Sequence, residues 1–292
     1  DSNTAVGKSA LSADTLGSKS TAIGSNALAT QNFTTASASN NVAVGYNSGT
    51  SITTAANNTF IGTSAGELVT TGSFSLFCGF GAGKGTSGQG LTGSFNVALG
   101  YETGFKLQTS GHENTFIGSY AGYYNGSNST ANGITTGHNN TAIGFAAYPT
   151  SATVNNEFTL GNGTVDNLRC NDTSISSLSD ERDKTNIVDV PLGLDFIKTL
   201  RPVAFDWNRR DGSNVGKKDF GFIAQELKVA QDATSYADQM RLVHSGFVEV
   251  DEKQQESLEA DPMKTYPVLI KAVQELSTAL DAALARIATL EG

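Results

Sequence analysis

The stretch NTFIGTSAGELVTTGSF, residues 58–74, is one unit of a repeat that fills the first half of this 292-residue chain. Its NTFIG segment occurs in related form nine times, and each copy ends in glycine. The spacing between successive glycines is 17 residues in four of the eight intervals and longer in the other four. Coils of constant length with added loops are typical of a solenoid. The nine glycines are Gly7, Gly24, Gly45, Gly62, Gly79, Gly100, Gly118, Gly144 and Gly161.

Two further positions of the unit are regular. The residue before each glycine is apolar, and the third residue after it is small. Glycine permits a bend that a Cβ would oppose, and a small residue permits close packing of the chain. We therefore expect two brief β-strands per coil and no helix in this region. The apolar positions are Val6, Ile23, Val44, Ile61, Cys78, Leu99, Ile117, Ile143 and Leu160, and the small ones are Ala10, Ala27, Ser48, Ala65, Ala82, Thr103, Ala121, Ala147 and Thr164.

One such coil is too short to enclose a core of its own, since two strands of roughly five residues remain once the turns are removed. A monomeric triangular β-helix would need about three apolar positions per coil, and only one is regular here. We therefore expect the apolar edge to be buried by neighbouring coils and by neighbouring chains, in an oligomeric shaft.

The composition changes sharply near residue 178. Of the 32 glycines, 26 precede Ser179, whereas 14 of the 19 Lys and Arg residues and 20 of the 28 Asp and Glu residues follow from there. Two domains are therefore expected. The net charge of −9 leaves neither half with the basic surface that nucleic acid or an anionic membrane would select. No stretch approaches 18 consecutive apolar residues, so we expect no membrane insertion.

The start of the chain and its cysteines carry further expectations. The chain begins DSNTAVGK, without Met or the apolar segment of a signal peptide, so we expect a fragment of a longer soluble protein whose N-terminal region is missing. The spacing of Cys78 and Cys170 suggests neither a metal site nor a disulfide framework, so reduced thiols and no cofactor are expected.

The repeat resembles the parallel β-roll heads of trimeric autotransporter adhesins, whose units carry a similar N-[ST]-x-[AVI]-[IV]-G pattern, and similar repeats occur in phage tail fibres. The resemblance covers roughly residues 3–163. It implies a homotrimer with a β-repeat, receptor-facing shaft over residues 1–163, followed by a connecting strand or linker over residues 164–178.

Receptor recognition is expected in the insertions, because loops on a rigid scaffold are free to vary. The longest, from Tyr123 through Asn139, joins Tyr123, Tyr124 and His138 to a flexible polar stretch. These tyrosines would stack on a sugar or pack on a receptor; alternatively, they cover the apolar edge of the next coil. His112 and His138 have no cysteine or carboxylate cluster at ligand spacing, so no metal is expected.

The hexapeptide SDERDK, residues 179–184, marks the compositional border. By itself it reads as a helix N-cap at Ser179 followed by acidic residues in the first turn. Its context is more informative, because it is followed by GLDFIKTLRPVAFDW at 193–207, FGFIAQEL at 220–227 and YPVLIKAVQEL at 266–276. In this order and spacing, residues 179–292 resemble the C-terminal intramolecular chaperone and auto-processing domain of endosialidase-type tailspikes and phage tail fibres.

This second resemblance implies that the chain cleaves itself once, between Leu178 and Ser179. Ser179 would be the nucleophile and Lys184 the general base of a serine peptidase acting in cis. A lysine amine accepts a proton near neutral pH only if burial or positive charge lowers its pKa. Arg182 could supply such charge, whereas Asp180, Glu181 and Asp183 act in the opposite direction. Asp180 and Arg182 are therefore candidate supporting residues, and a buried geometry in an assembled trimer would resolve the conflict.

The rest of this segment predicts a small α+β fold. Helical spacing covers residues 192–200, and strands are expected at 202–207 and 221–224 around a turn-rich loop. Four aromatic residues are interpreted as core rather than binding site, and Gln225 and Glu226 are placed at a helix start. The four are Phe205, Trp207, Phe220 and Phe222.

The last helix, expected at about residues 266–290, carries three heptads of apolar residues, which indicate a coiled coil. Three heptads are marginal alone. They suit a transient device that holds three chains in register while the slow, non-local β pairing of the shaft forms. Positions a are Val273, Leu280 and Ile287, and positions d are Leu269, Leu276, Ala283 and Leu290.

Together these patterns predict the distal part of a trimeric phage tail fibre or tailspike that is assembled in the host cytoplasm, resides in the virion and attaches to a polysaccharide or protein receptor. The missing N-terminal region would join it to the rest of the tail. One rival is a bacterial trimeric adhesin, which would need a C-terminal membrane anchor. Another is a depolymerase, whose carboxylate pair would have to lie upstream, because the eight acidic residues before Ser179 are scattered.

Overall fold

The computed structural model describes residues 2–86, 88, 90–108, 110–123, 136–165, 167–171, 179–210, 214–250 and 253–291, with side chains of 246–256 outside the description. The chain divides into two compact units, Asp1–Val165 and Asp166–Gly292. We call the first the solenoid and the second the C-terminal unit, and each is described by itself.

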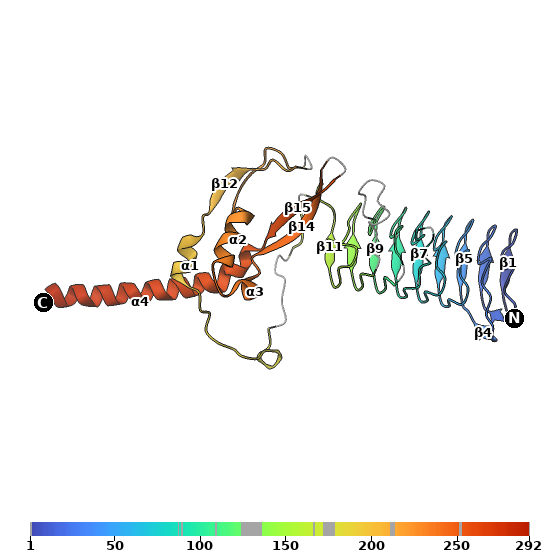
Figure 1. Cartoon of the computed structure of the whole chain (residues 1–292), viewed down its shortest axis with the longest axis horizontal. Helices are drawn as coiled ribbons and strands as arrows, with labels where there is room; N and C mark the ends of the chain where they lie inside the picture. Colours follow the sequence, from blue (N-terminus) through green and yellow to red (C-terminus); the bar gives the residue numbers. More distant parts are fainter. Residues whose placement is uncertain are drawn as a thin grey trace. The chain divides into compact units, whose positions relative to one another are not determined.

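The solenoid is built on one parallel sheet of nine strands, each three residues long and each supplied by one copy of the repeat (Figure 1). Equivalent residues of successive coils are paired, as Thr59 is with Leu76 and Ile61 with Cys78. The spacing of about 17 residues therefore sets the length of a coil, as predicted. The strands are β1 (Thr4–Val6), β3 (Thr21–Ile23), β5 (Val42–Val44), β6 (Thr59–Ile61), β7 (Leu76–Cys78), β8 (Val97–Leu99), β9 (Thr115–Ile117), β10 (Thr141–Ile143) and β11 (Phe158–Leu160).

The expectation of two strands per coil is wrong. Among the described residues, the coils have one strand each, apart from a short extra pair formed by β2 (Gly17–Ser18) and β4 (Ser37–Ala38). The other side of each coil consists of turns, yet its backbone is also bonded from coil to coil: the Gly66 amide donates to Ala82 O at 2.9 Å, and the Gly83 amide to Thr103 O at 2.9 Å. Residues with a left-handed backbone conformation interrupt the extended geometry on that side, but the hydrogen bonds between successive coils continue.

The glycine that ends each strand allows close stacking. Gly62 has φ +130°, and a Cβ at this position would lie 2.5 Å from the carbonyl oxygen of Gly79 in the next coil. That distance is far below van der Waals contact, so no other residue fits without displacing the neighbouring coil.

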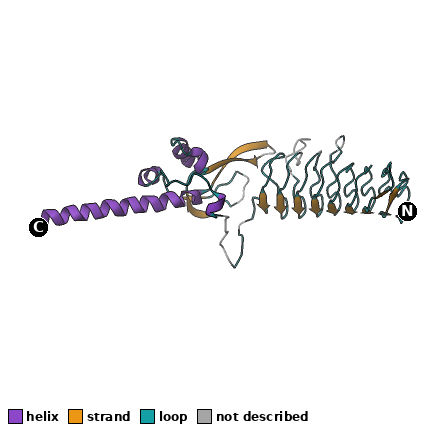
Figure 2. Ribbon diagram, turned by 90° about the horizontal axis from the view of Figure 1, so that it is seen from below, coloured by secondary structure: helices purple, strands orange, loops and turns teal. Residues whose placement is uncertain are grey.

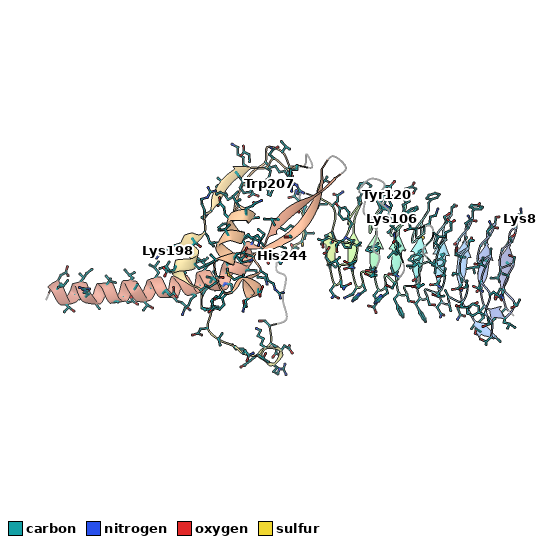
Figure 3. All side chains as sticks on the ribbon, in the orientation of Figure 1. Lys8, Lys106, Tyr120, Lys198, Trp207 and His244 are labelled. Atoms are coloured by element: carbon teal, nitrogen blue, oxygen red, sulfur yellow. The ribbon has the colours of Figure 1, made fainter. Side chains whose placement is uncertain are left out.

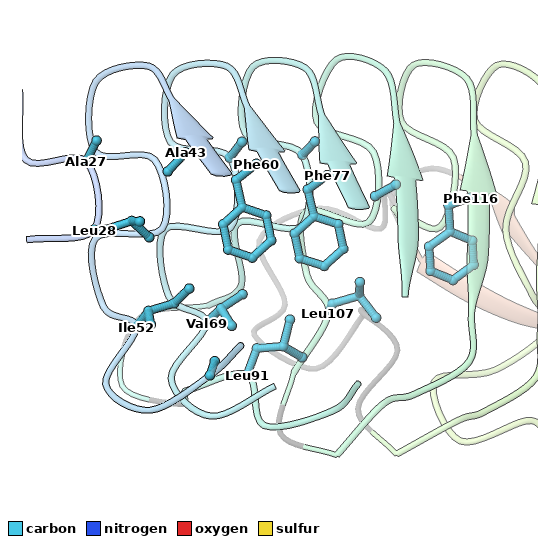
Figure 4. Packing of buried hydrophobic residues seen from close by; sticks show 14 of the residues in the cluster. Ala27, Leu28, Ala43, Ile52, Phe60, Val69, Phe77, Leu91, Leu107 and Phe116 are labelled. Carbon is cyan, nitrogen blue, oxygen red and sulfur yellow. The ribbon is translucent and has the colours of Figure 1, made fainter. Parts of the chain in front are cut away.

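The core of the solenoid lies within one chain, which corrects the expectation that a coil cannot enclose one. The middle residue of most strands points inward and is fully buried, whereas the apolar residue before the glycine points outward, as Val6 does with 58% of its surface exposed. Seven of the nine small residues three positions after the glycine are buried, as predicted for close packing, whereas Ala10 in the first coil is half-buried and Thr164 in the last is exposed. Figure 4 shows the Phe rings and aliphatic side chains that fill this interior. The inward strand residues are Ala22, Ala43, Phe60, Phe77, Ala98, Phe116 and Ala142.

A buried row of asparagines runs through the coils one residue before the strands. Asn58 shows the pattern: its amide N–H donates to Asn41 Oδ1 at 2.9 Å, and its own Nδ2 donates to Gly72 O at 3.0 Å. Asn140 N likewise donates to Asn114 Oδ1 at 3.1 Å. These bonds satisfy backbone groups that the turns leave inside the core. The asparagine that begins the NTFIG segment thus has a structural role in most coils, and Ser20, Ser75 and Glu157 replace it in the others.

The C-terminal unit contains all the long helices of the described chain (Figure 2). It comprises η1 (Glu181–Asp183), α1 (Leu194–Thr199), β12 (Val203–Asp206), β13 (Lys218–Gly221), α2 (Ala224–Asp232), α3 (Ala237–Met240), β14 (Val243–Val250), β15 (Lys253–Ala260), η2 (Pro262–Thr265) and α4 (Tyr266–Glu291). Strands β12 and β13 pair antiparallel, as do β14 and β15. A small core joins Phe196, Met240, Leu242 and Val268.

The expected small α+β fold with its long C-terminal helix is confirmed, with local corrections. The helix predicted at 192–200 is α1, and the strand predicted at 202–207 is β12. The strand predicted at 221–224 is wrong, since β13 ends at Gly221 and α2 begins at Ala224. The core assignment of Trp207 and Phe220 is also wrong within one chain, because they are 38% and 85% exposed, and Phe205 and Phe222 are only half-buried. The described residues 162–165 and 167–171 contain no strand.

Candidate functional site

Ser179 and Lys184 are brought together at the start of the C-terminal unit. Lys184 Nζ donates a hydrogen bond to Ser179 Oγ at 2.6 Å and another to Ser179 O at 3.1 Å. The hydroxyl therefore already lies within proton-transfer distance of the amine. A neutral amine in the same position would accept the hydroxyl proton instead of donating to the oxygen. Leu178, the residue before the predicted scissile bond, lies outside the described residues.

A single 3₁₀ turn, η1, closes the distance between these two residues. Its N-cap is Asp180, not Ser179 as the sequence suggested: Arg182 N donates to Asp180 Oδ1 at 2.9 Å. At the other end, Lys184 N donates to Glu181 O at 3.1 Å. The turn folds the backbone back, so that a side chain five residues on can reach Ser179. Capping residues with short polar side chains favour such turns.

Arg182 and Asp180 form a two-point ion pair that stabilises the turn. Arg182 Nε and Nη2 lie 3.0 and 2.6 Å from Asp180 Oδ1 and Oδ2. The side-chain hydrogen bond from Arg182, followed by the backbone one, holds the pKa of Asp180 below its usual value. Conversely, the hydrogen bond to Asp180 raises the pKa of Arg182. Because this guanidinium is paired with a carboxylate, its charge is compensated locally, and holding the turn is the role that the geometry gives it.

No residue of η1 is buried, and the Arg182 side chain is 88% exposed. In a solvated turn, water screens charges and stabilises an ammonium ion. The burial that lysine-base chemistry requires is therefore not supplied by the surroundings of this turn within one described chain.

The predicted heptad residues lie on α4 and form an exposed stripe. Leu269, Val273, Leu276, Leu280 and Leu290 are all exposed, whereas Val268 and Ala272 on another face are buried. The buried face packs toward α1, where Leu194 N donates to Glu275 Oε2 at 2.8 Å. Helix α4 thus has one apolar face that packs against the rest of the C-terminal unit and a second apolar face that is exposed. Ile270 and Leu284, which the heptads do not include, widen the exposed stripe.

The predicted receptor residues separate into two places. Tyr123 has its ring 5.7 Å from Phe105 and 5.7 Å from Tyr120, within a group of aromatic residues beside the strands. His138 stacks on His112 with ring centroids 4.8 Å apart, at a parallel β-bridge. Tyr124 lies outside the described residues.

Sequence reasoning missed Tyr101, Glu102 and Tyr120, which adjoin Tyr123. Part of their signal was available. Tyr101 stands directly after its repeat glycine, where several other coils have Ser, Thr or Lys, and Tyr120 stands one position later, where other coils have Ser, Asn, Gly or Ala. In the described part of the chain, no three His, Cys, Asp or Glu side chains gather as a metal ion would need. Cys78 and Cys170 are free thiols. No helix among the described residues combines the length and the hydropathy needed to cross a membrane.

Comparison with known proteins gives one result that bears on this site. Residues 179–235 match the family model described as chaperone of endosialidase, and the match begins at Ser179. This is a family of self-cleaving chaperones, which supports an autoprocessing peptidase activity. Searches of curated proteins and of solved structures find no match. The family match and the β-solenoid together fit a tail fibre that carries an endosialidase-type chaperone domain.

Proposed function

We propose that this chain is the distal part of a trimeric phage tail fibre or tailspike that attaches to a host, and that residues 179–292 are a chaperone that releases itself. The chaperone drives trimerisation and folding of the solenoid, after which the chain is cut between Leu178 and Ser179. The observation that carries the processing proposal is the 2.6 Å contact of Lys184 Nζ with Ser179 Oγ. It lies at the first residue of the family match.

The proposed cleavage proceeds through an ester intermediate on Ser179 Oγ. Ser179 Oγ attacks the carbonyl carbon of Leu178 while its proton passes to the neutral Lys184 Nζ. The bond between Leu178 C and Ser179 N breaks, the Ser179 nitrogen takes up a proton, and Leu178 remains as an ester on Oγ. Water then hydrolyses the ester, which leaves a Leu178 carboxylate and restores the Ser179 hydroxyl.

The exposure of η1 supports a role for assembly in starting this reaction. A lysine amine ordinarily has a pKa of about 10.4, and desolvation lowers it. A neighbouring copy that covers the turn would supply that desolvation. Cleavage would then wait until the chains are associated, which is the order that a folding device requires.

Two exposed apolar surfaces support the trimer. One is the stripe on α4, and three-stranded coiled coils bury such stripes. The other is the outward row of strand residues in the solenoid, which includes Val6, Ile23 and Ile61. Once the α4 bundle has departed, the non-local pairing of the solenoid loses the device that aligned it, so its stability becomes kinetic.

Denaturing gel electrophoresis of the expressed chain tests the processing proposal. Wild type should give fragments of 178 and 114 residues, whereas Ser179→Ala and Lys184→Ala should each give one intact band. Mass spectrometry should find Ser179 as the first residue of the smaller fragment. Lys198→Ala is the matched control, since Lys198 is an exposed lysine of the same unit that pairs with Asp195.

Each contrary outcome has a distinct meaning. An intact wild-type band refutes processing in this protein. Equal cleavage of wild type and both variants removes the roles assigned to Ser179 and Lys184. Loss of cleavage in Lys198→Ala would show that the assay reports general damage to the C-terminal unit.

The attachment role is tested separately. A fluorescently labelled, processed protein should adsorb to the surface of susceptible bacteria and compete with the virus that carries it. Lack of adsorption under conditions where that virus adsorbs would refute attachment by this region. Native mass spectrometry of the same sample should give three times the mass of the solenoid fragment.

A further inference from the structure

The repeat provides an internal comparison that separates residues needed for the fold from residues that are not. In eight of the nine coils the position directly after the strand glycine begins the same turn, and the last coil differs. Most coils place a polar or small residue there, and a subset places an aromatic one. An aromatic side chain is therefore not required by the fold at this position. The column reads Lys8, Ser25, Tyr46, Thr63, Phe80, Tyr101, Ser119, Phe145 and Asn162.

The next position in the coil sharpens this comparison, because its backbone is left-handed. Small or polar residues occupy it in the other coils: Ser9, Asn26, Asn47, Ser64, Gly81 and Ala146. In two adjacent coils, however, it holds Glu102 at φ 48° and Tyr120 at φ 60°. A large non-glycine residue in this region is held at a cost in backbone energy, and such residues concentrate at functional sites.

Tyr120 lies at the centre of an aromatic cluster, defined here as Phe80, Tyr101, Phe105, Tyr120, Tyr123 and Phe145. Phe80 stacks on Tyr101 with centroids 5.4 Å apart, and Tyr120 meets Tyr101 edge-on at 5.4 Å and Phe145 at 6.0 Å. The cluster remains open to solvent: Tyr101 is 45% and Phe145 65% exposed. Figure 3 labels Tyr120 and Lys106 on this part of the solenoid.

Polar groups converge on these rings. The Tyr101 hydroxyl interacts with the Glu102 carboxylate and with Tyr120, and Glu102 is the main cause of the raised pKa of Tyr101. Burial, followed by the charge of Glu102, raises the pKa of Tyr123. Tyrosine phenols are protonated at neutral pH and can donate hydrogen bonds. Lys84 and Lys106 lie 5.6 and 5.2 Å over the rings of Phe105 and Tyr123.

We propose that the aromatic cluster and Glu102 form a binding site for a neutral glycan. Aromatic faces pack against the C–H faces of sugar rings, while a carboxylate and phenols bind pairs of sugar hydroxyls. The Glu102 carboxylate beside Tyr101 and Tyr123 disfavours acidic polysaccharides, and Lys84 is already paired with Glu67 at 3.2 Å. The inference deepens the proposed attachment role, since it names the chemistry of the receptor.

The test compares the full chain with variants that borrow residues from sister coils, so that the fold is preserved. Tyr101→Ser copies Ser25 and Ser119, and Glu102→Asn copies Asn26 and Asn47. Affinity electrophoresis through dextran, mannan and galactan should show binding of the wild-type chain to at least one polymer. Each variant should bind about tenfold more weakly, as expected for the loss of one charged hydrogen bond or one stacked ring. Tyr46→Ser is the control, because Tyr46 is exposed in the same column outside the cluster.

Several outcomes overturn the site. These are no retention by any of the neutral polymers, retention only by the acidic polymer hyaluronate, or equal retention of wild type, Tyr101→Ser and Glu102→Asn. A change of assembly mass in the two variants would assign the surface to contacts between copies instead.

Cell adsorption separates the binding-site proposal from the attachment proposal. Adsorption that both variants retain refutes the site but not attachment, and glycan binding without adsorption refutes attachment but not the site.

Discussion

The solenoid closes a continuous core within one chain, whereas the C-terminal unit has only a small core and leaves many of its large apolar side chains at the surface. The main core cluster of the solenoid contains 18 buried residues and that of the C-terminal unit contains four. In the C-terminal unit, Val188 is 80% and Phe220 85% exposed, and the apolar stripe on α4 is exposed as well. The contrast supports the proposal that the C-terminal unit depends more on partner chains than the solenoid does. It also agrees with the proposed release of this unit after assembly, since a segment that is released needs no durable core of its own.

The largest effect is expected at the exposed apolar stripe on α4, since the difference between the two units predicts that this surface depends on other chains. Leu280→Asp should leave the chain monomeric and unprocessed. A buried leucine contributes about 1.5–3 kcal/mol, so three copies weaken a trimer by about 5–9 kcal/mol. Sedimentation and gel electrophoresis measure the two effects. Thr278→Asp, on the same helix outside the heptad seam, should assemble and process normally; a similar defect there would remove the coiled coil from the proposal.

The second effect tests the independence of the solenoid core. Phe116→Ala removes a fully buried ring and should cost about 3–5 kcal/mol of stability. Phe145→Ala, at a 65% exposed ring, is the matched control and should cost less than about 1 kcal/mol. Denaturant unfolding monitored by circular dichroism distinguishes them. Equal losses would mean that the solenoid is held together mainly by contacts between chains.

The third effect concerns the buried asparagine row. Asn114→Ala leaves the Asn140 amide and the Gly137 carbonyl without this side chain, and each buried unsatisfied group costs about 1–3 kcal/mol. The loss should be smaller than that of Phe116→Ala and largest in the neighbouring coils, as measured by amide hydrogen exchange. Asn32→Ala is the control, because exposed Asn32 makes one side-chain bond, to Thr15. A uniform change across all coils would contradict a local role.

The smallest effect is the acid response of η1. Pairing with Arg182 lowers the pKa of Asp180 from its usual value of 3.8. The contribution of this carboxylate is therefore present above pH 3.8 and is lost as the pH falls through the lower, folded-state pKa. Carboxyl carbon NMR should give a midpoint below 3.8 for Asp180, and Arg182→Ala should raise it toward 3.8, because only the backbone hydrogen bond from residue 182 remains. An unchanged midpoint in the variant would show that the ion pair does not form in solution.

Much of this architecture could be predicted from local pattern. The period of the strand glycines predicts the coil, and the heptads predict the final helix, because both depend on neighbours close in sequence. Helix α1 and strand β12 were predicted for the same reason, whereas β13 ends at the first residue of the range that was predicted for it. The β14–β15 hairpin was not, because the polar sequence of β15 lacks the alternation that marks a strand. The Ser179–Lys184 pair was found through family resemblance, while the capping role of Asp180 required the geometry.

The sequence by itself determined the repeat, its period and the change of character near residue 178, since these are properties of order along the chain. Only the tertiary structure decided which apolar row points inward. In a strand of three residues, alternation assigns the two outer positions to one face and the middle position to the other, but it does not say which face is the core. The stacking of the coils decides which face is the core. The middle residues of the strands, such as Phe60 and Phe116, lie inside, and the apolar residue before the glycine faces outward. The stacking of coils also brings Tyr101 and Glu102 of one coil close to Tyr120 of the next.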